Sequence, residues 1–149
     1  MGELLGGVAA KGLYLLLLRV PAGVRLHLPA AGPEPTEVPT GWCVYVGSAR
    51  GAGGLRSRLA HHLRPVTRPH WHIDRLRLAG AIVVGVLTIP DAPGGARPLT
   101  EECAVAARLA KWPGAHRNPA RFGSSDCRCP GHLIHWGDGS DRMGQRRRP

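Results

Sequence analysis

Arg58 and His62 are four residues apart in a leucine-containing segment that follows a glycine-rich turn. In a helix, this spacing directs both side chains from the same side. A guanidinium group can hold a phosphate, and an imidazole can accept or donate a proton near neutral pH. The pair therefore predicts a site that handles a phosphate and a proton. The simpler alternative is a surface arginine beside a half-buried histidine.

Glu102 is a second candidate, near the beginning of a helix predicted over Thr100–Lys111. At helical spacing it shares a face with the apolar residues Val105 and Leu109. A carboxylate on such a face is costly unless a metal ion or another cation meets it. Acidic residues in a first helical turn can also simply offset the helix dipole. That alternative explains Glu101 well and Glu102 less well.

Sulfur and imidazole groups gather toward the C-terminus in a pattern that resembles half of a zinc site. The candidate ligands are Cys127, Cys129 and His132, with His70, His72 or His135 as a source of the fourth. Buried thiols in a polar turn are the alternative.

Composition limits the class of protein. The chain has 149 residues, 21 glycines, 14 prolines and a formal charge of +10, so we expect one compact domain with an anionic partner. A GC-rich genome could also produce the arginine excess. The apolar runs Leu13–Leu18 and Ala81–Ile89 are too short to span a membrane. Four scattered cysteines favour reduced thiols in a soluble cytoplasmic protein, with Cys43 and Cys103 as small buried apolar residues.

Hydrophobic periodicity predicts the elements that carry these residues. Strands are expected over Gly12–Val20, Val24–Leu28, Trp42–Val46, Ala81–Ile89 (as a central strand) and His132–Trp136. Pro29–Pro39 is expected to be a loop. A helix from Leu55 to about Pro65 should bury Leu55, Leu59 and Leu63, and a short helix or turn should follow at His70–Leu76. Residues 1–11 are expected to form a lead-in, 12–136 the domain and 137–149 a basic, disordered tail.

The two tyrosines of the chain each lie beside a glycine, in Gly12-Leu13-Tyr14 and in Tyr45-Val46-Gly47-Ser48-Ala49. This ordered set, continued by Arg58, His62 and Glu102, resembles the GIY-YIG nuclease superfamily. Further motifs resemble one poorly characterised branch, whose members stand alone or are fused to endonuclease III-type repair enzymes. These motifs are Gly53–Leu63, His70–Asp74, Glu102-Cys103 and Phe122–Cys129.

The resemblance implies an α/β fold with a small central antiparallel sheet flanked by helices. It has three core strands, and Val24–Leu28 is expected to add one more. It implies that Tyr14 and Tyr45 lie side by side and that Glu102 binds a single Mg²⁺ or Mn²⁺ ion. The implied catalytic residues are Tyr14, Tyr45, Arg58, His62 and Glu102. We expect substrate contacts from Gly47, Ser48, Arg56 and His61.

The function implied is a metal-dependent endonuclease that hydrolyses DNA phosphodiester bonds in repair or in the processing of DNA structures. DNA is favoured over RNA as the partner, and a DNA-repair protein is expected as a further partner. No association with a membrane is expected, and the expected location is the cytoplasm, on the nucleoid when the protein is bound to DNA. One alternative is a non-catalytic nucleic-acid-binding module of the same fold, stabilised by zinc. Another is a small structural domain whose cysteines and histidines only hold loops together.

Overall fold

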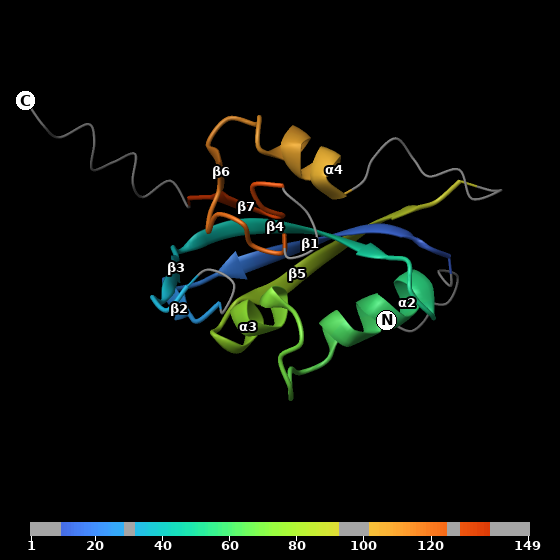
Figure 1. Cartoon of the computed structure of the whole chain (residues 1–149), viewed down its shortest axis with the longest axis horizontal. Helices are drawn as coiled ribbons and strands as arrows, with labels where there is room; N and C mark the ends of the chain where they lie inside the picture. The colour runs from blue at the N-terminus through green and yellow to red at the C-terminus, as the bar shows by residue number, and fades with distance from the viewer. Residues whose placement is uncertain (1–9, 29–31, 93–101, 125–128, 138–149) are drawn as a thin grey trace, which may run out of the picture.

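The computed structural model describes residues 10–28, 32–92, 102–124 and 129–137. These residues form an α/β fold with a five-stranded antiparallel sheet and three helices (Figure 1). The elements are β1 (Gly12–Val20), β2 (Val24–Leu26), β3 (Thr36–Val38), β4 (Gly41–Ala49), α2 (Gly54–Leu63), α3 (His72–Leu78), β5 (Ile82–Pro90), α4 (Glu102–Leu109), β6 (Ala115–Arg117) and β7 (Leu133–Trp136).

The two longest-paired strands, β1 and β4, lie next to each other within the sheet, whose order is β5-β1-β4-β7-β6. Their register pairs Gly12 with Ala49 and Val20 with Gly41, so both strands are matched over their full length. The continuous apolar run of β1 fits this central place, because a strand covered on both faces carries apolar residues at every position.

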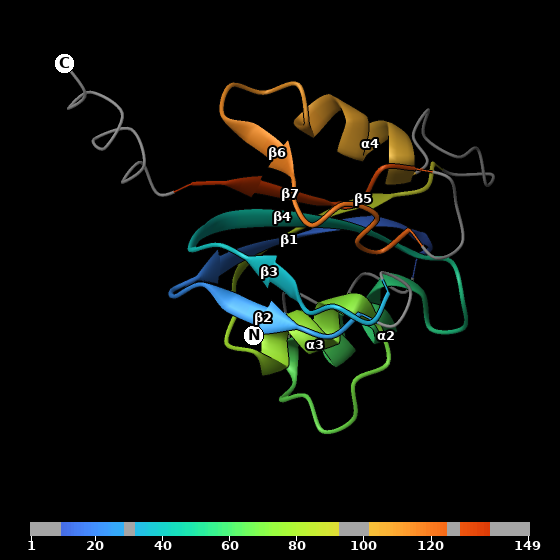
Figure 2. The same cartoon turned by 60° about the vertical axis from the view of Figure 1, so that its left-hand side comes forward.

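Helices cover both faces of the sheet, α2 and α3 on one face and α4 on the other (Figures 1 and 2). Side chains on a strand alternate between faces. Leu16 and Leu18 of β1 therefore pack in the core beneath α2 and α3, whereas Leu15 packs in the smaller cluster beneath α4. The α2 stripe is shorter than predicted. Leu55 and Leu59 are buried, but Leu63 is 36% exposed because the helix ends there.

The segment between β1 and β4 holds a separate hairpin. β2 pairs with β3 in a two-stranded sheet and does not join the main one. The prediction of one added strand was therefore incomplete, because the proline-rich stretch expected as a loop contains β3. Pro35 and Pro39 flank β3 on either side, so the three residues between them keep the backbone N–H groups that pair with β2. β6, three residues long, was missed because so short a strand has no readable periodicity.

The prediction of Ala81–Ile89 as a central strand was wrong in position. The strand forms as β5, but it lies at the edge of the sheet, where Ile82, Val84 and Leu87 are more than half exposed. β-branched residues favour a strand whether it lies at the centre or at the edge. The many β-branched residues of this segment therefore indicated a strand, but they did not indicate where in the sheet the strand lies.

Several predictions fall outside the described residues. They concern the lead-in up to residue 9, the helix start at Thr100 and the tail from residue 138 onward. Within the described residues, no helix is long and apolar enough to cross a membrane.

Candidate active site

Tyr14 and Tyr45 lie on the neighbouring strands β1 and β4, with ring centroids 6.4 Å apart. Gly47 is paired directly with Tyr14 and gives its ring room. A Cβ atom at position 47 would lie 2.3 Å from both Cζ and Oη of Tyr14. Burial is the main cause that raises the pKa of each tyrosine above its ordinary value, so both phenols remain protonated at neutral pH.

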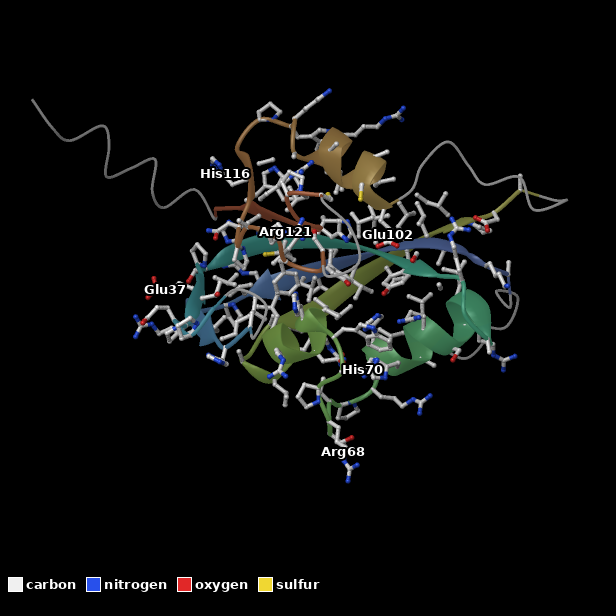
Figure 3. All side chains as sticks on the ribbon, viewed as in Figure 1. Glu37, Arg68, His70, Glu102, His116 and Arg121 are labelled. Carbon is white, nitrogen blue, oxygen red and sulfur yellow. The ribbon has the colours of Figure 1, made fainter. Side chains whose placement is uncertain are left out.

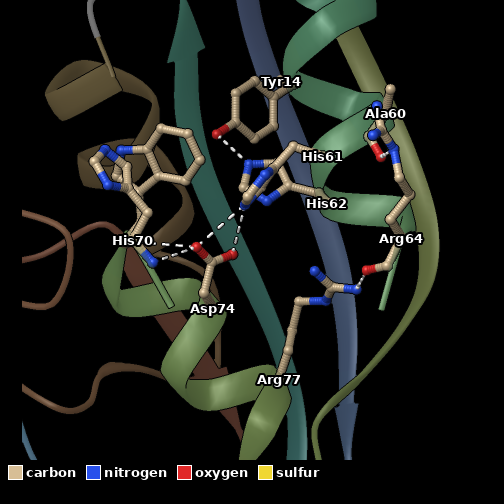
Figure 4. Close-up of polar contacts among 9 residues, drawn as sticks. Tyr14, Ala60, His61, His62, Arg64, His70, Asp74 and Arg77 are labelled. Carbon is tan, nitrogen blue, oxygen red and sulfur yellow. Dashed lines mark hydrogen bonds and ion pairs between the residues drawn. The ribbon is translucent and has the colours of Figure 1, made fainter. Parts of the chain in front are cut away.

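His62 of α2 is buried and meets the hydroxyl of Tyr14, with its Nε2 2.8 Å from Oη (Figure 4). Which partner donates depends on the ring nitrogen that carries the proton. Burial lowers the pKa of His62 to about 3, so the imidazole is neutral at pH 7. The structure thus joins a protonated phenol and a neutral imidazole in one buried hydrogen bond.

Trp71, just before α3, contacts the side chains of both candidate residues of α2, Arg58 and His62. The guanidinium carbon of Arg58 lies 4.2 Å from the centre of the Trp71 ring, and the His62 ring centroid lies 5.8 Å from it. Stacking on an indole face fixes the plane of an arginine. Arg58, His61 and Trp71 also line a hollow of about 190 Å³ beside the beginning of α2.

Asp74 of α3 is fully buried and organises the residues around Trp71 (Figure 4). Its carboxylate accepts hydrogen bonds from the backbone N–H groups of His70 and Trp71, and from Nε2 of His61 at 3.1 Å. Burial by itself would raise the pKa of Asp74, but these hydrogen bonds lower it below its ordinary value. Asp74 and Trp71 were not predicted as site residues, although the motif His70–Asp74 contains both.

Glu102 is the first residue of α4 and lies on the side of the helix that faces the sheet (Figure 3). Its side chain is 30% exposed, and Oε2 is 3.4 Å from Nδ1 of His132. The negative charge of Glu102 raises the pKa of Tyr14 and Tyr45, while the positive charge of Arg58 lowers it. Glu102 and Arg58 therefore act on the same two phenols.

The predicted substrate-contacting residues lie around this centre in different settings. Gly47 is buried against Tyr14, and His61 is bound to Asp74. Ser48 is half-buried on β4, and Arg56 is exposed on α2.

Cysteine and histidine side chains form a second group near α4. Among the described residues, Cys103, Cys129 and His132 bring their ligand atoms within 4.8 Å of one another and could hold a metal ion. Cys103 was expected to be a buried apolar residue, but it is only half-buried and contacts His132. Cys127 lies outside the described residues.

The other predicted zinc ligands make different contacts. His72 accepts a hydrogen bond on Nδ1 from the backbone N–H of Gly123, and His135 contacts the carbonyl oxygen of Pro39 through Nε2. The exposed His70 packs its ring against Trp71.

Comparison with known proteins gave one family. The model of the domain of unknown function DUF123 matches residues 13–147, nearly the whole chain. Searches of curated proteins and of solved structures gave no match.

Proposed function

The chain belongs to the family of the domain of unknown function DUF123, and we propose that it is a GIY-YIG-type, metal-dependent endonuclease that hydrolyses DNA phosphodiester bonds. One observation carries the proposal. The buried Tyr14–His62 hydrogen bond lies where the charges of Arg58 and Glu102 both act on Tyr14. Phosphodiester hydrolysis needs a positioned water, a cation for the phosphate and a means of stabilising the leaving oxygen, and these four residues fit those needs.

Arg58 is suited to bind the non-bridging oxygens of the phosphate. Its guanidinium lies over the ring of Trp71, next to the hollow that both residues line. A planar fork of N–H donors in a fixed position matches the oxygens of a phosphate. Because the stacking is present before substrate arrives, little conformational freedom is lost on binding.

Tyr14 is suited to orient the attacking water. With its O–H donated to His62, the lone pairs of Tyr14 Oη are left to accept a hydrogen bond from water. The neutral His62 has a lone pair on Nε2 for the tyrosine proton as the water loses its own. A negative phosphate nearby favours the charged form of the imidazole, which offsets part of the effect of burial.

Glu102 fits a hard divalent cation such as Mg²⁺ or Mn²⁺. Oε2 lies near His132, and the partial exposure of the side chain leaves room for a carboxylate oxygen to bind an ion. A single carboxylate can suffice, because Mg²⁺ keeps several of its waters. When bound, the ion would act as a Lewis acid toward the phosphate and the leaving 3′ oxygen.

The net charge of +10 supports a nucleic acid as the partner. The same charge and the Cys103–Cys129–His132 group favour a second candidate. In that alternative the protein is a zinc-stabilised module that binds nucleic acid without cleaving it. The two candidates differ in whether Glu102 is needed for cleavage.

The test is a cleavage assay on duplex, single-stranded and branched DNA with Mg²⁺ or Mn²⁺. We compare wild type with Glu102→Gln, which keeps the shape of the side chain, and with Glu37→Gln as the matched control. Glu37 is exposed on β3 and pairs only with the exposed Arg25 in the described structure. We expect metal-dependent nicking in wild type and in Glu37→Gln, and a loss of about 100-fold or more in Glu102→Gln.

DNA binding, measured in the same buffers, separates the outcomes. Retained binding by Glu102→Gln, with cleavage lost, supports a metal-binding carboxylate. Binding without cleavage by all three proteins on every substrate overturns the proposal in favour of the binding module. Equal cleavage by wild type and Glu102→Gln overturns the role of Glu102.

A further inference from the structure

Two thiols and an imidazole from separate parts of the chain meet beside α4. Cys103 comes from the first turn of this helix, and Cys129 and His132 come from the segment that leads into β7. All three ligand atoms lie within 4.8 Å of one another, and Cys129 and His132 are buried. Cys103 is half-buried, so the group lies close enough to the surface for an ion to enter.

The spacing agrees with a tetrahedral zinc site. Zinc binds sulfur at about 2.3 Å and imidazole nitrogen at about 2.0–2.1 Å, which places two such ligands about 3.6 Å apart at a tetrahedral angle. Cys103 Sγ and His132 Nε2 are 3.4 Å apart. The two ligand atoms therefore already stand at almost the separation that a shared zinc ion requires.

Two polar groups contact the sulfur of Cys129. Nη1 of Arg117 lies 3.9 Å from Cys129 Sγ, and the thiol donates to the carbonyl oxygen of Gly131 at 3.6 Å. When a metal ion displaces the thiol proton, a guanidinium at this place can stabilise the metal-bound thiolate. Cys43 lies apart from this group on β4, where burial raises the pKa of its thiol to about 12.

The second ring nitrogen of His132 points to a carboxylate. Nδ1 is 3.4 Å from Oε2 of Glu102. Metal-binding histidines commonly use their other nitrogen to donate to a carboxylate, which sets the tautomer and the ring orientation. With Nε2 on a metal, Nδ1 must carry the proton and can donate to Glu102.

We propose that Cys103, Cys129 and His132 bind a zinc ion, which fastens the first turn of α4 to the segment before β7. Thiolate and imidazole ligands suit zinc, whereas magnesium prefers oxygen. This ion is distinct from the one proposed at Glu102. The zinc proposal does not depend on nuclease activity, so the result of the cleavage assay neither supports nor contradicts it.

The first measurement is zinc content and X-ray absorption on the reduced wild-type protein. We expect one zinc per chain, with two sulfur ligands at about 2.3 Å and a nitrogen at about 2.0–2.1 Å. Wild-type protein that neither contains zinc nor takes it up stoichiometrically overturns the proposal. If protein purified without reductant lacks zinc, is two hydrogens lighter than the reduced form and yields a peptide that joins Cys103 to Cys129, the two residues form a disulfide, and this result also overturns the zinc site.

The second measurement compares variants of equal sulfur content. Cys103→Ser should lose one sulfur from the zinc shell and at least about tenfold in zinc affinity, whereas Cys43→Ala should match wild type. A Cys103→Ser protein with the wild-type sulfur number and affinity would show that the site uses other ligands, and this overturns the assignment. Because absorption on wild type already counts sulfur and nitrogen, a variant that fails to fold does not remove the test.

Discussion

Gly47→Ala tests whether packing in the sheet holds Tyr14 in place for the proposed chemistry. The added Cβ would lie 2.3 Å from Cζ and Oη of Tyr14, whereas ordinary contact begins at 3.4 Å. Tyr14 is only 2% exposed, and its ring is enclosed by the core and His62. The ring must therefore move by about 1 Å, or β1 and β4 must separate, since packed interiors hold little free space.

Overpacking of this kind costs about 1–3 kcal/mol of folding free energy, which lowers the melting temperature of a chain of this size by about 2–12 °C. A displacement of about 1 Å at a reacting group can cost about 100-fold in rate. We therefore expect Gly47→Ala to fold with reduced stability and to lose about 100-fold in nicking rate. Thermal unfolding and cleavage of supercoiled DNA measure the two effects.

Gly85→Ala is the matched control. Gly85 pairs with the other side of β1, and a Cβ there would meet Leu17 at an ordinary 3.6 Å. A second comparison places Gly47→Ala in a Tyr14→Leu background, where the clash with the ring is gone. There the substitution should cost less than about 0.5 kcal/mol, because the coupling energy of the pair is removed. An equal stability loss in both backgrounds, or a fully active and stable Gly47→Ala protein, would refute the reasoning.

Two further predictions concern α2 and its neighbours. Trp71→Leu removes the aromatic ring over which Arg58 lies, a contact worth about 0.5–2 kcal/mol, so the nicking rate should fall by about 2- to 30-fold. Trp112→Leu, at an exposed tryptophan, is the control and should leave the nicking rate unchanged. Equal nicking rates in the two variants would contradict the role of Trp71. Because the pKa of His62 is about 3 in the folded protein and 6.5 is its ordinary value, protons bind the unfolded chain more tightly, and folding stability falls as the pH drops below 6.5. Between pH 7 and 5 the wild type should lose about 2 kcal/mol more than His62→Gln in urea unfolding, and parallel losses would show that His62 is not buried as a neutral base.

Local patterns predicted the central elements because their physical causes are local. The apolar run of Gly12–Val20 became β1 with those bounds, and the spacing of Arg58 and His62 placed both on α2. Both side chains contact Trp71, as expected for residues that leave one side of a helix. The face of α4 was also read correctly, since Ala106 is buried while Val105 and Leu109 pack against the smaller core cluster.

Features that depend on distant contacts could not be read in the same way. The burial of Asp74 depends on how α3 packs against α2. A buried carboxylate needs hydrogen-bond donors, and here they come from His61 of α2 and from backbone N–H groups of the turn before α3. The place of β5 at the sheet edge depends on which strands pair with β1 and leaves no trace in its own composition. Cys103 was read as an apolar residue because its partner His132 lies 29 residues away along the chain.

The position of Glu102 has its own structural cause. Glu102 and Cys103 are adjacent, so in α4 their side chains diverge by about 100° and cannot both point to one atom. A single His132 ring nevertheless contacts both, Glu102 through Nδ1 and Cys103 through Nε2. A zinc ion on Nε2 would hold the ring fixed and direct the Nδ1 proton at Glu102, leaving the other carboxylate oxygen for the Mg²⁺ or Mn²⁺ ion proposed there. If both proposed sites exist, removing zinc should weaken the binding of Mn²⁺ at Glu102 even though zinc takes no part in cleavage.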